Sequence, residues 1–578
     1  MSELIGYLKP YKKEVILGPI FKLIEAIFEL LLPTILALII NNGVNQHNTA
    51  YVIKMGFVML AMSLLGFCSS LVCQYFAART SQGFGTTLRN AMFTHIFSLS
   101  HAEINHWGNS TLINRITNDV NQLQLAVAML IRLVIRAPFI CIGAMIMAMI
   151  LDFRLALILI AATPFLGLVL YLIINKTSPL YTKYQQKMDR IAQILEENLS
   201  GVRIIRAFAQ KRNEQQKFET ANDDLTITAV RVGKISALLN PLTTLVMNLA
   251  ILAILWLGGI HINSGTLSQG DIIAFVNYLT QILLALIVVS NLVIIFTKAY
   301  ASAKRVTEVL TTSSSIIENS AESVVPVNTS APLIEFRNVS FGYNPTGDRA
   351  LSNLSIRVAQ GETLGIIGGT GSGKSTFVNL IPRFYDVTDG EILIGGINIK
   401  DFPLHELRQK IGFVPQKAVL FTGTVAENIR WGNPNASIEE VAAAAKIAQA
   451  HEFIIDLPGR YDAPVTRGGT NLSGGQRQRL TIARAMVGHP QILILDDSAS
   501  ALDFATEAAL RQAIRRSSHN LTLLMVSQRI STIQQADRIL VLDDGHMAGI
   551  GTHDELMNTC RIYQEIYRSQ LAGSEGVA

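Results

Sequence analysis

The sequence has little charge and few cysteines for its length. Charged residues make up 16% of the 578 residues, well below the quarter or so that is usual in soluble domains, while hydrophobic residues make up 49%. The four cysteines form no CxxC pair and show no metal-ligand spacing, which argues against a zinc site. The net charge of +5 is spread along the chain, without the concentrated basic face that nucleic-acid binding needs. These absences exclude nucleic acid as an expected partner and favour a membrane protein.

Six long hydrophobic runs occupy the first 310 residues. Each is near the length of about 20 residues that spans a bilayer. The segments that join them alternate between short, uncharged turns and long loops that carry most of the Lys and Arg. The positive-inside rule therefore predicts a multi-pass protein of the cytoplasmic membrane, with both termini and both long loops in the cytoplasm. The runs lie near residues 17–41, 55–77, 127–151, 155–174, 237–260 and 272–297.

The two long loops, 78–124 and 175–235, keep a helical pattern beyond the hydrophobic runs. Loops of this length without structure are uncommon, so we expect helices that project into the cytoplasm. Short cross-helices would turn the chain back toward the membrane. The candidates for these turns are His101–Trp107 and Ala209–Phe218.

The composition changes after residue 310. Thr311–Ala331 is rich in Ser, Thr and Ala and is typical of a linker. Beyond it, apolar strands alternate with helices, which predicts a mainly parallel α/β sheet with ligands at the carboxyl ends of its strands. The expected organisation is a six-helix transmembrane domain over 1–310, a linker over 311–331 and an α/β nucleotide-binding domain over 332–578.

A complete P-loop follows the strand LGIIG and opens the helix STFVNLI. In this motif, glycines let backbone N–H groups wrap a phosphate, the lysine reaches the β- and γ-phosphates, and the serine ligates Mg²⁺. ATP and Mg²⁺ are therefore the expected cofactors. Asp496 ends a later hydrophobic strand and should help to hold Mg²⁺, and Tyr343 either stacks on adenine or is a plain surface residue. The residues expected to bind phosphate are Gly368, Gly369, Thr370, Gly371, Ser372, Gly373, Lys374, Ser375 and Thr376.

Further motifs make the resemblance specific. LSGGQ at 472–476 resembles the signature of ABC ATPases, Gln416 resembles their Q-loop glutamine, and SALD at 500–503 resembles their D-loop. With six spans ahead of it, the chain resembles an ABC half-transporter of the exporter (type IV) kind. That resemblance implies a dimer in which each ATP lies between the P-loop of one subunit and the signature of the other. It assigns nucleotide contacts to Leu472, Ser473, Gly474, Gly475, Gln476 and Asp503, and a further Mg²⁺ contact to Gln416.

Two departures from the family pattern fall at hydrolysis positions. Asp497 stands where the family usually has the glutamate that polarises water, and Gln528 stands where it usually has a histidine. Arg467-Gly468 also replaces a common Glu-Arg pair ahead of the signature. With every binding motif kept, this combination resembles one half of heterodimeric bacterial multidrug exporters. The site built from Asp497, Gln528 and Gln416 would then be degenerate and retain ATP, while the LSGGQ would complete the partner's competent site.

Charged residues inside the hydrophobic runs are the candidates for substrate contacts. Lys22, Glu25 and Glu29 share one face of the first run, and charges at membrane depth often line a cavity. Lys22 and Glu25 lie close enough to the boundary to snorkel, so Glu29 is the better candidate. Arg132 and Arg136 either pair with these glutamates or face anionic headgroups.

The expected function is ATP-driven export of hydrophobic or amphipathic compounds, in a heterodimer with a second half-transporter. A homodimeric exporter or a lipid flippase is an alternative. So is an ATP-binding regulatory or gating subunit without its own substrate path.

Overall fold

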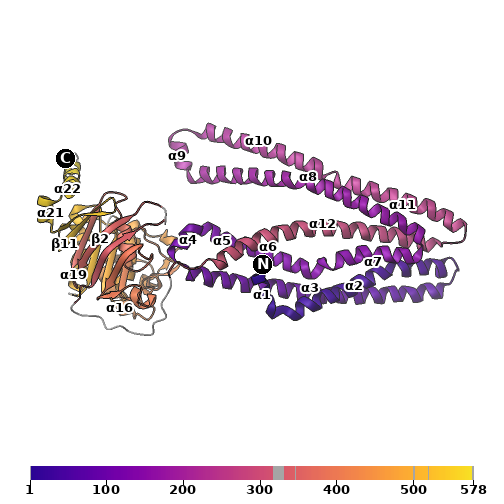
Figure 1. The fold of residues 1–578 in the computed structure, drawn as a ribbon, viewed down its shortest axis with the longest axis horizontal. Coiled ribbons are helices and arrows are strands. Elements are labelled where there is room, and N and C mark those ends of the chain that lie inside the picture. The colour runs from indigo at the N-terminus through magenta and orange to yellow at the C-terminus, as the bar shows by residue number, and fades with distance from the viewer. Residues whose placement is uncertain (1, 317–330, 345–346, 499–500, 518–519, 576–578) are drawn as a thin grey trace. The chain divides into compact units, whose positions relative to one another are not determined.

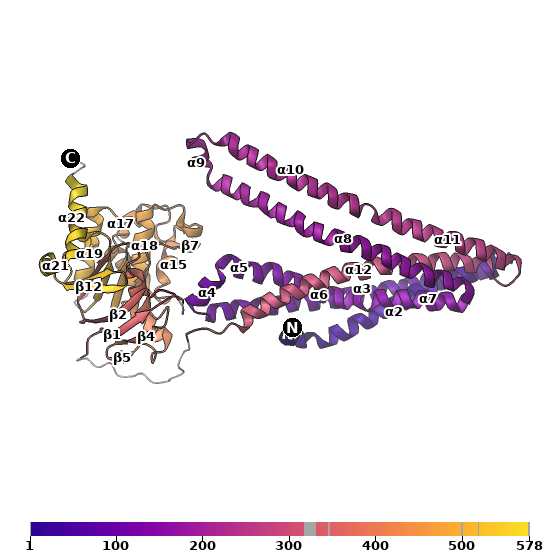
Figure 2. The same cartoon turned by 45° about the horizontal axis from the view of Figure 1, so that its top comes forward.

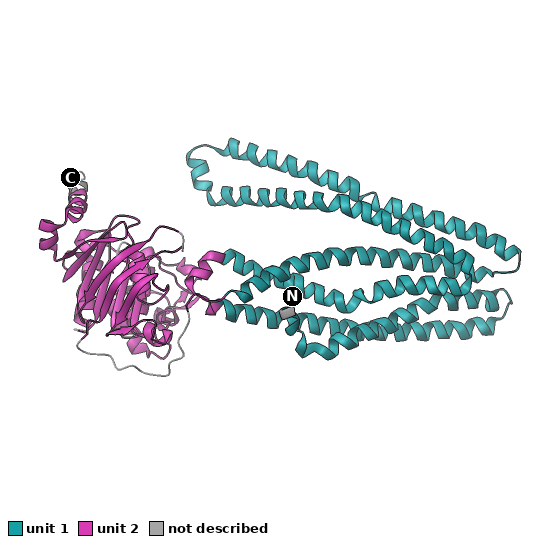
Figure 3. Cartoon of the chain, viewed as in Figure 1, with its two compact units in different colours: residues 1–96, 109–312 teal, residues 97–108, 313–578 magenta. Residues whose placement is uncertain are grey.

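The computed structural model describes residues 2–316, 331–344, 347–498, 501–517 and 520–575. The chain forms two compact units, residues 1–96 with 109–312 and residues 97–108 with 313–578 (Figure 3). A short piece of the first long loop, residues 97–108, therefore belongs to the second unit. The domain boundaries predicted from the sequence, at residues 310 and 332, place this piece in the transmembrane domain instead. The expected linker Thr311–Ala331 lies mostly outside the described residues.

Unit 1 is built from long helices (Figures 1 and 2). Among the described residues, six helical segments are long and apolar enough to cross a membrane, and each contains one of the predicted hydrophobic runs. These segments are Gly6–Val44, Thr49–Ser98, Asn109–Leu151, Phe153–Ser200, Lys211–Asn263 and Gln269–Thr311. Their helices are α1 (Ser2–Gly6), α2 (Lys12–Leu38), α3 (Thr49–Ser98), α5 (Asn109–Asn114), α6 (Val120–Met129), α7 (Arg136–Leu151), α8 (Phe153–Ser200), α10 (Lys211–Ser236), α11 (Leu239–Asn263) and α12 (Gln269–Thr311).

Small residues and local caps explain the packing of these helices. Ala144, Ala156 and Ala274 are fully buried where α7, α8 and α12 meet, and small residues let membrane helices approach closely. The turn between α7 and α8 is the single residue Asp152, whose carboxylate accepts a hydrogen bond from the N–H of Leu155 at 2.9 Å. This cap satisfies one of the N–H groups that a helix start leaves unpaired.

The cross-helices differ from expectation in one case. Helix α4 spans His101–Trp107 as predicted, and it begins with a capping box between Ser100 and Glu103. The second candidate, Ala209–Phe218, is wrong, because the short helix α9 lies earlier, at Val202–Ala207. Helix α8 ends at Ser200 with Gly201 as its C-cap, and Ala209 has a φ of 55°, so the reversal is complete before residue 211. The remainder of the predicted segment forms the first turns of α10, which pairs with α8 (Figures 1 and 2).

Unit 2 contains two main sheets among its described residues. The larger has the order β12-β11-β3-β10-β9-β6, with β11, β3, β10, β9 and β6 parallel, and the smaller antiparallel sheet has the order β2-β1-β4-β5. The central strand β3 is completely buried, as a parallel strand covered on both faces should be. The strands are β1 (Ile334–Phe341), β2 (Leu351–Val358), β3 (Thr363–Gly368), β4 (Asp389–Ile394), β5 (Ile397–Asn398), β6 (Ile411–Val414), β7 (Gly423–Thr424), β8 (Pro464–Val465), β9 (Ile492–Asp496), β10 (Thr522–Val526), β11 (Arg538–Asp543) and β12 (His546–Gly551).

The parallel register of β3, β10 and β9 brings three functional segments to one edge. The P-loop follows β3, Asp496 ends β9, and the Gln528 segment follows β10. The helices of this unit are α13 (Lys374–Leu380), α14 (Leu404–Gln409), α15 (Val425–Arg430), α16 (Ile438–Ile447), α17 (His451–Asp456), α18 (Gly474–Met486), α19 (Phe504–Ser517), α20 (Ile530–Ile533), α21 (His553–Thr559) and α22 (Arg561–Glu575).

Candidate functional site: a nucleotide pocket at the carboxyl edge of the parallel sheet

A cavity of about 390 Å³ lies where the P-loop leaves β3 and enters α13. Residues distant in sequence meet here because the parallel strands deliver their carboxyl ends to the same edge. The lining residues are Tyr343, Ala350, Thr370, Gly371, Ser372, Gly373, Lys374, Ser375, Thr376, Gln416, Asp496, Asp497, Val526 and Gln528.

The P-loop backbone requires glycine and positions Lys374. Gly373 has a φ of 94°, and a Cβ on it would lie 2.7 Å from the carbonyl oxygen of Ala350, so a side chain at this position would clash with the start of β2. The Nζ of Lys374 donates to the carbonyl oxygens of Gly368 at 2.9 Å and Gly369 at 2.6 Å. Burial lowers the pKa of Lys374, because it penalises the charged ammonium. These hydrogen bonds hold the Lys374 amine over the P-loop backbone.

Asp496 and Ser375 meet across the pocket floor. The Ser375 hydroxyl donates to the Asp496 carboxylate at 3.1 Å. Burial raises the pKa of Asp496, and the neighbouring Asp497 raises it further. A hydroxyl and a carboxylate are hard oxygen ligands of the kind Mg²⁺ prefers.

Asp497 is held next to Gln416. The Nε2 of Gln416 donates to the Asp497 carboxylate at 3.3 Å, and the backbone N–H of Asp497 donates to Val526 O at 3.0 Å. The φ of Asp497 is 45°, in the left-handed region where aspartate is better tolerated than most side chains. Burial raises the pKa of this carboxyl as well.

The segment after β10 carries Gln528 to the cavity wall. The Ser527 N–H donates to Ile366 O on the P-loop strand at 3.1 Å, which ties this segment to β3. Gln528 lines the cavity, together with Asp497 and Gln416. Sequence reasoning missed Ala350, which also lines the cavity, and Gln570, which hydrogen-bonds the backbone of Gln528. No local motif marks either residue.

Tyr343 lies at the rim of the pocket. Its side chain is half exposed, and its hydroxyl shares a hydrogen bond with the Thr376 hydroxyl at 3.0 Å. Its ring meets the rings of Phe341 and Tyr385 edge-on, at centroid distances of 4.9 and 5.3 Å. This places an aromatic surface beside the P-loop, where a nucleobase could stack.

The signature and the D-loop aspartate lie outside this cavity. Ser473 caps α18, with its hydroxyl accepting from the Gln476 N–H at 3.2 Å, so the first amides of α18 are oriented by a capping box. The Asp503 carboxylate accepts from both the N–H and the hydroxyl of Thr506, at 2.9 and 2.8 Å. Ser500 of the same D-loop falls outside the described residues. Among the described residues, neither 472–476 nor Asp503 lines the P-loop cavity.

The residues of the pocket fit ATP with Mg²⁺. The glycine cradle and Lys374 suit the phosphates, and the pair Ser375–Asp496 suits the cation. A bound Mg²⁺ would neutralise charge on the β- and γ-phosphates. A helix N-terminus directly after the loop, at α13, adds the favourable end of a helix dipole.

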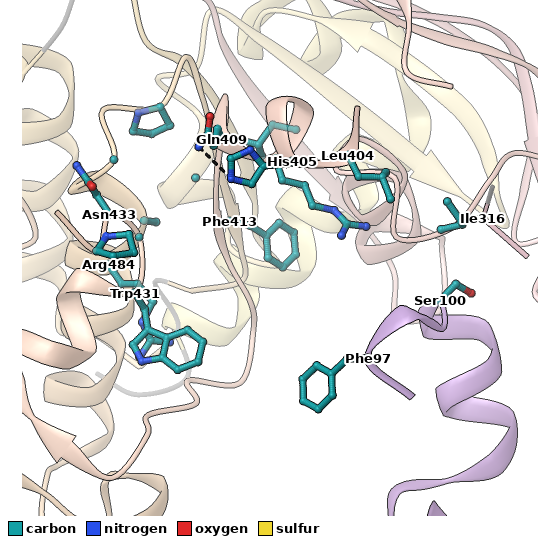
Figure 4. A pocket seen from close by; sticks show the side chains of 18 of the residues that line it. Phe97, Ser100, Ile316, Leu404, His405, Gln409, Phe413, Trp431, Asn433 and Arg484 are labelled. Atoms are coloured by element: carbon teal, nitrogen blue, oxygen red, sulfur yellow. Dashed lines mark hydrogen bonds between the residues drawn. The ribbon is translucent and has the colours of Figure 1, made fainter. Parts of the chain in front are cut away.

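A larger groove of about 1320 Å³ lies elsewhere in unit 2 (Figure 4). No P-loop residue lines it, so the nucleotide site is assigned by its chemistry and not by cavity size. Figure 4 shows Phe97 across open space from Phe413 and Trp431. Helix α4 packs beside this region, with the ring of His101 4.8 Å from that of Phe384 and Asn105 donating to the Tyr385 hydroxyl at 3.0 Å. The labelled lining residues are Phe97, Ser100, Ile316, Leu404, His405, Gln409, Phe413, Trp431, Asn433 and Arg484.

Four of the five charged residues that the sequence named as substrate candidates form two ion pairs. Lys22 Nζ lies 2.6 Å from Glu25 Oε2, and Arg136 Nη2 lies 2.6 Å from Glu29 Oε2. Glu29 therefore joins α2 to the start of α7. Among the described residues, Arg132 has no acidic partner, and its Nε is buried without a hydrogen bond.

The similarity to known proteins agrees with this geometry. Residues 15–286 match the family described as ABC transporter transmembrane region, and residues 351–500 match the family described as ABC transporter. The uncharacterized ABC transporter ATP-binding protein YfiB of Bacillus subtilis is 39% identical over 576 residues, covering 100% of this chain and 99% of YfiB. YgaD of the same organism, whose name provisionally gives it a multidrug export role, is 32% identical and covers 99% of both chains.

A solved structure extends this likeness to the fold. A bacterial Atm1-family ABC exporter with ATP bound aligns with a TM-score of 0.77 at 27% identity, covering 98% of this chain and 99% of that one. The six spanning helices and the α/β domain with its P-loop therefore define an ATP-driven membrane transporter. The chain belongs to the ABC transporter family, as an exporter half-transporter that binds ATP and works as a dimer.

Proposed function

We propose that this chain is one subunit of a heterodimeric ABC exporter of hydrophobic or amphipathic compounds. Its own P-loop, Asp497 and Gln528 form a degenerate site that retains ATP with Mg²⁺ and hydrolyses it weakly. Its LSGGQ completes a competent site whose P-loop comes from the partner. Membership of the ABC transporter family supports the export function. The residues at the two hydrolysis positions, Asp497 and Gln528, support the asymmetry between the two ATP sites.

The observation that carries the proposal is the geometry around Asp497. Its carboxylate is one methylene shorter than that of the usual glutamate and is engaged by Gln416 at 3.3 Å, so it is poorly placed to reach an attacking water. Gln528 offers a neutral amide where an imidazole would titrate near neutral pH. The P-loop, Ser375 and Asp496 keep the contacts that binding needs. Binding is thus supported more fully than hydrolysis.

The signature supports the head-to-tail arrangement. Ser473 and Gly475 begin α18 in a geometry suited to a γ-phosphate, yet they lie outside this chain's own nucleotide cavity. A second subunit would bring its P-loop to them. The same pairing would bring the partner's signature to Lys374.

The substrate path is proposed to pass the Glu29–Arg136 pair. This pair sits within two spanning segments, and Glu29 keeps 36% of its side chain exposed. Lys22, Glu25 and Arg132 add polar groups to an otherwise apolar bundle. Such a surface suits amphipathic compounds that carry a small polar part.

Both termini and the nucleotide domain are proposed to face the cytoplasm. Ser264, between α11 and α12, would then face outward, whereas Lys211, the first residue of α10, would face inward. In a variant without native cysteines, a membrane-impermeant maleimide should label Ser264→Cys in intact cells and leave Lys211→Cys unlabelled. The reverse pattern would invert the topology.

Purification of the full chain alone tests the asymmetry. We expect ATP binding that Lys374→Met abolishes, with hydrolysis close to the Lys374→Met background. Co-expression with a second half-transporter that has glutamate and histidine at the hydrolysis positions should restore turnover. A stable homodimer with brisk ATPase activity would favour the homodimeric exporter or flippase instead.

Transport measurements separate the regulatory alternative. Substrate-protected labelling at a cysteine placed at Glu29 supports a substrate path through this chain. A complex whose transport is insensitive to every change at Glu29 and Arg136, while ATP binding here still controls its rate, would favour a gating subunit.

A further inference from the structure

The segment that carries Gln528 begins a helix without a cap of its own. Helix α20 starts at Ile530, and its N-cap residue Arg529 makes no side-chain capping hydrogen bond. The first N–H groups of a helix have no partner within the helix and must find one elsewhere. The partner of Ile530 comes from the C-terminal helix, far along the chain.

Gln570 on α22 holds this segment with both ends of its amide. Its Oε1 accepts from the Ile530 N–H at 3.0 Å, and its Nε2 donates to the Gln528 carbonyl oxygen at 2.7 Å. A glutamine amide has one acceptor and one donor group, so a single side chain brackets Arg529 from both sides. The two contacts fix the backbone on which the Gln528 side chain is mounted.

Helix α22 is anchored well enough to act as a support. Tyr563 is fully buried, and its hydroxyl is 2.8 Å from the Nδ1 of His553 on α21. Ile566 and Tyr567 pack against the same core. Gln570 follows Tyr563 by seven residues, or two helical turns, and so lies on the same side of α22 as the buried Tyr563.

We propose that Gln570 is a positioning residue of the nucleotide site, which sets the Gln528 side chain against the bound phosphates and thereby slows nucleotide release. The C-terminal helix thus becomes part of the ATP site through this contact. The proposal rests on the proposed function only in that Gln528 occupies the γ-phosphate switch position. A protein or ligand that displaces α22 would loosen that position without touching the P-loop.

The test measures release of a fluorescent ATP analogue, with Mg²⁺, from the full-length chain in nanodiscs. Gln570→Met keeps the length of the side chain and removes both hydrogen bonds, so release should quicken about fivefold, the value of one ordinary net hydrogen bond. Gln570→Glu keeps the acceptor for Ile530, loses the donor and should also quicken release. The matched control is Gln564→Met on the same helix, since Gln564 donates to Met557 O at 2.8 Å, away from the switch segment. It should leave release unchanged.

A double variant distinguishes positioning from general loosening. In a Gln528→Ala background, Gln570→Met should have no further effect, because the side chain it positions is gone. Additive effects, or unchanged release in Gln570→Met with an unchanged unfolding midpoint, would overturn the proposal. The wild-type hydrolysis rate tests the proposed function separately. If that rate proves brisk, the proposed function fails, and the KM for ATP is measured for wild type and for the same variants in place of the release rate. The positioning role of Gln570 is then judged from the ratios of these KM values alone.

Discussion

Lengthening the carboxylate at position 497 should raise hydrolysis at this chain's own site. Asp497→Glu adds one methylene and moves the carboxylate by about 1.5 Å, the length of a carbon–carbon bond. Gln416, now 3.3 Å from the Asp497 carboxylate, lines the same cavity, so the longer acid would project into the space where water must attack. Misplacement by about 1 Å costs on the order of a hundredfold in rate, so its repair should regain a similar factor, or about 2.7 kcal/mol.

The backbone sets a small cost against this gain. At a φ of 45°, aspartate is tolerated better than glutamate, so Asp497→Glu should lower the free energy of unfolding by no more than about 1 kcal/mol. Gln528 remains a neutral amide in the variant. Full restoration should therefore need Gln528→His as well.

The assay uses the complex with its partner after the partner's P-loop lysine has been replaced. Only the site built on Lys374 can then turn over, and phosphate release reports it. Lys374→Met gives the background rate. Asp497→Asn keeps the size of the side chain and removes its charge, so it shows how much of the wild-type rate depends on the carboxylate. If Asp497→Glu stays within twofold of wild type while nucleotide binding is unchanged, carboxylate reach does not limit this site, and the reasoning is refuted.

Three other predictions address neighbouring parts of the molecule. Ser473→Ala removes the N-cap of α18, should cost about 1 kcal/mol of stability, and should reduce ATPase activity of the complex more than any change at Asp497 alters it, as measured by steady-state phosphate release. Because burial raises the pKa of Asp496, its carboxylate protonates at a higher pH than an ordinary aspartate; Mg²⁺-dependent nucleotide binding should fall as pH is lowered through that raised value, and the step should vanish in Asp496→Asn titrations. Phe384→Ala removes the edge-on contact with His101, worth about 0.5–1.5 kcal/mol, and should lower substrate moved per ATP in inverted vesicles while basal hydrolysis persists; equal losses of both would instead indicate a folding defect.

Local patterns in the sequence were enough to predict the architecture of both domains and to name the P-loop residues that line the cavity. Hydrophobic length alone located all six spanning helices, because a bilayer demands about 20 apolar residues whatever their neighbours. The P-loop can likewise be recognised from the sequence, since local backbone geometry requires its glycines. Helix α4 was predicted correctly because Ser100 and Glu103 cap it from within four residues. The turn near Ala209 was misplaced because a polar helical pattern continues through residue 211 without marking where α10 begins.

The tertiary structure decided what depends on residues far apart in the chain. Only the fold shows that Glu29 pairs with Arg136, 107 residues away, although the sequence had named both. Only the fold groups residues 97–108 with the nucleotide domain. Gln570 belongs to no sequence motif. It acquires its role because α22 packs against the start of α20, which lacks a cap, and so brings Gln570 to Gln528, 42 residues earlier in the chain. A sequence specifies local geometry through nearby side chains, whereas partners for leftover N–H groups and buried charges are chosen by packing.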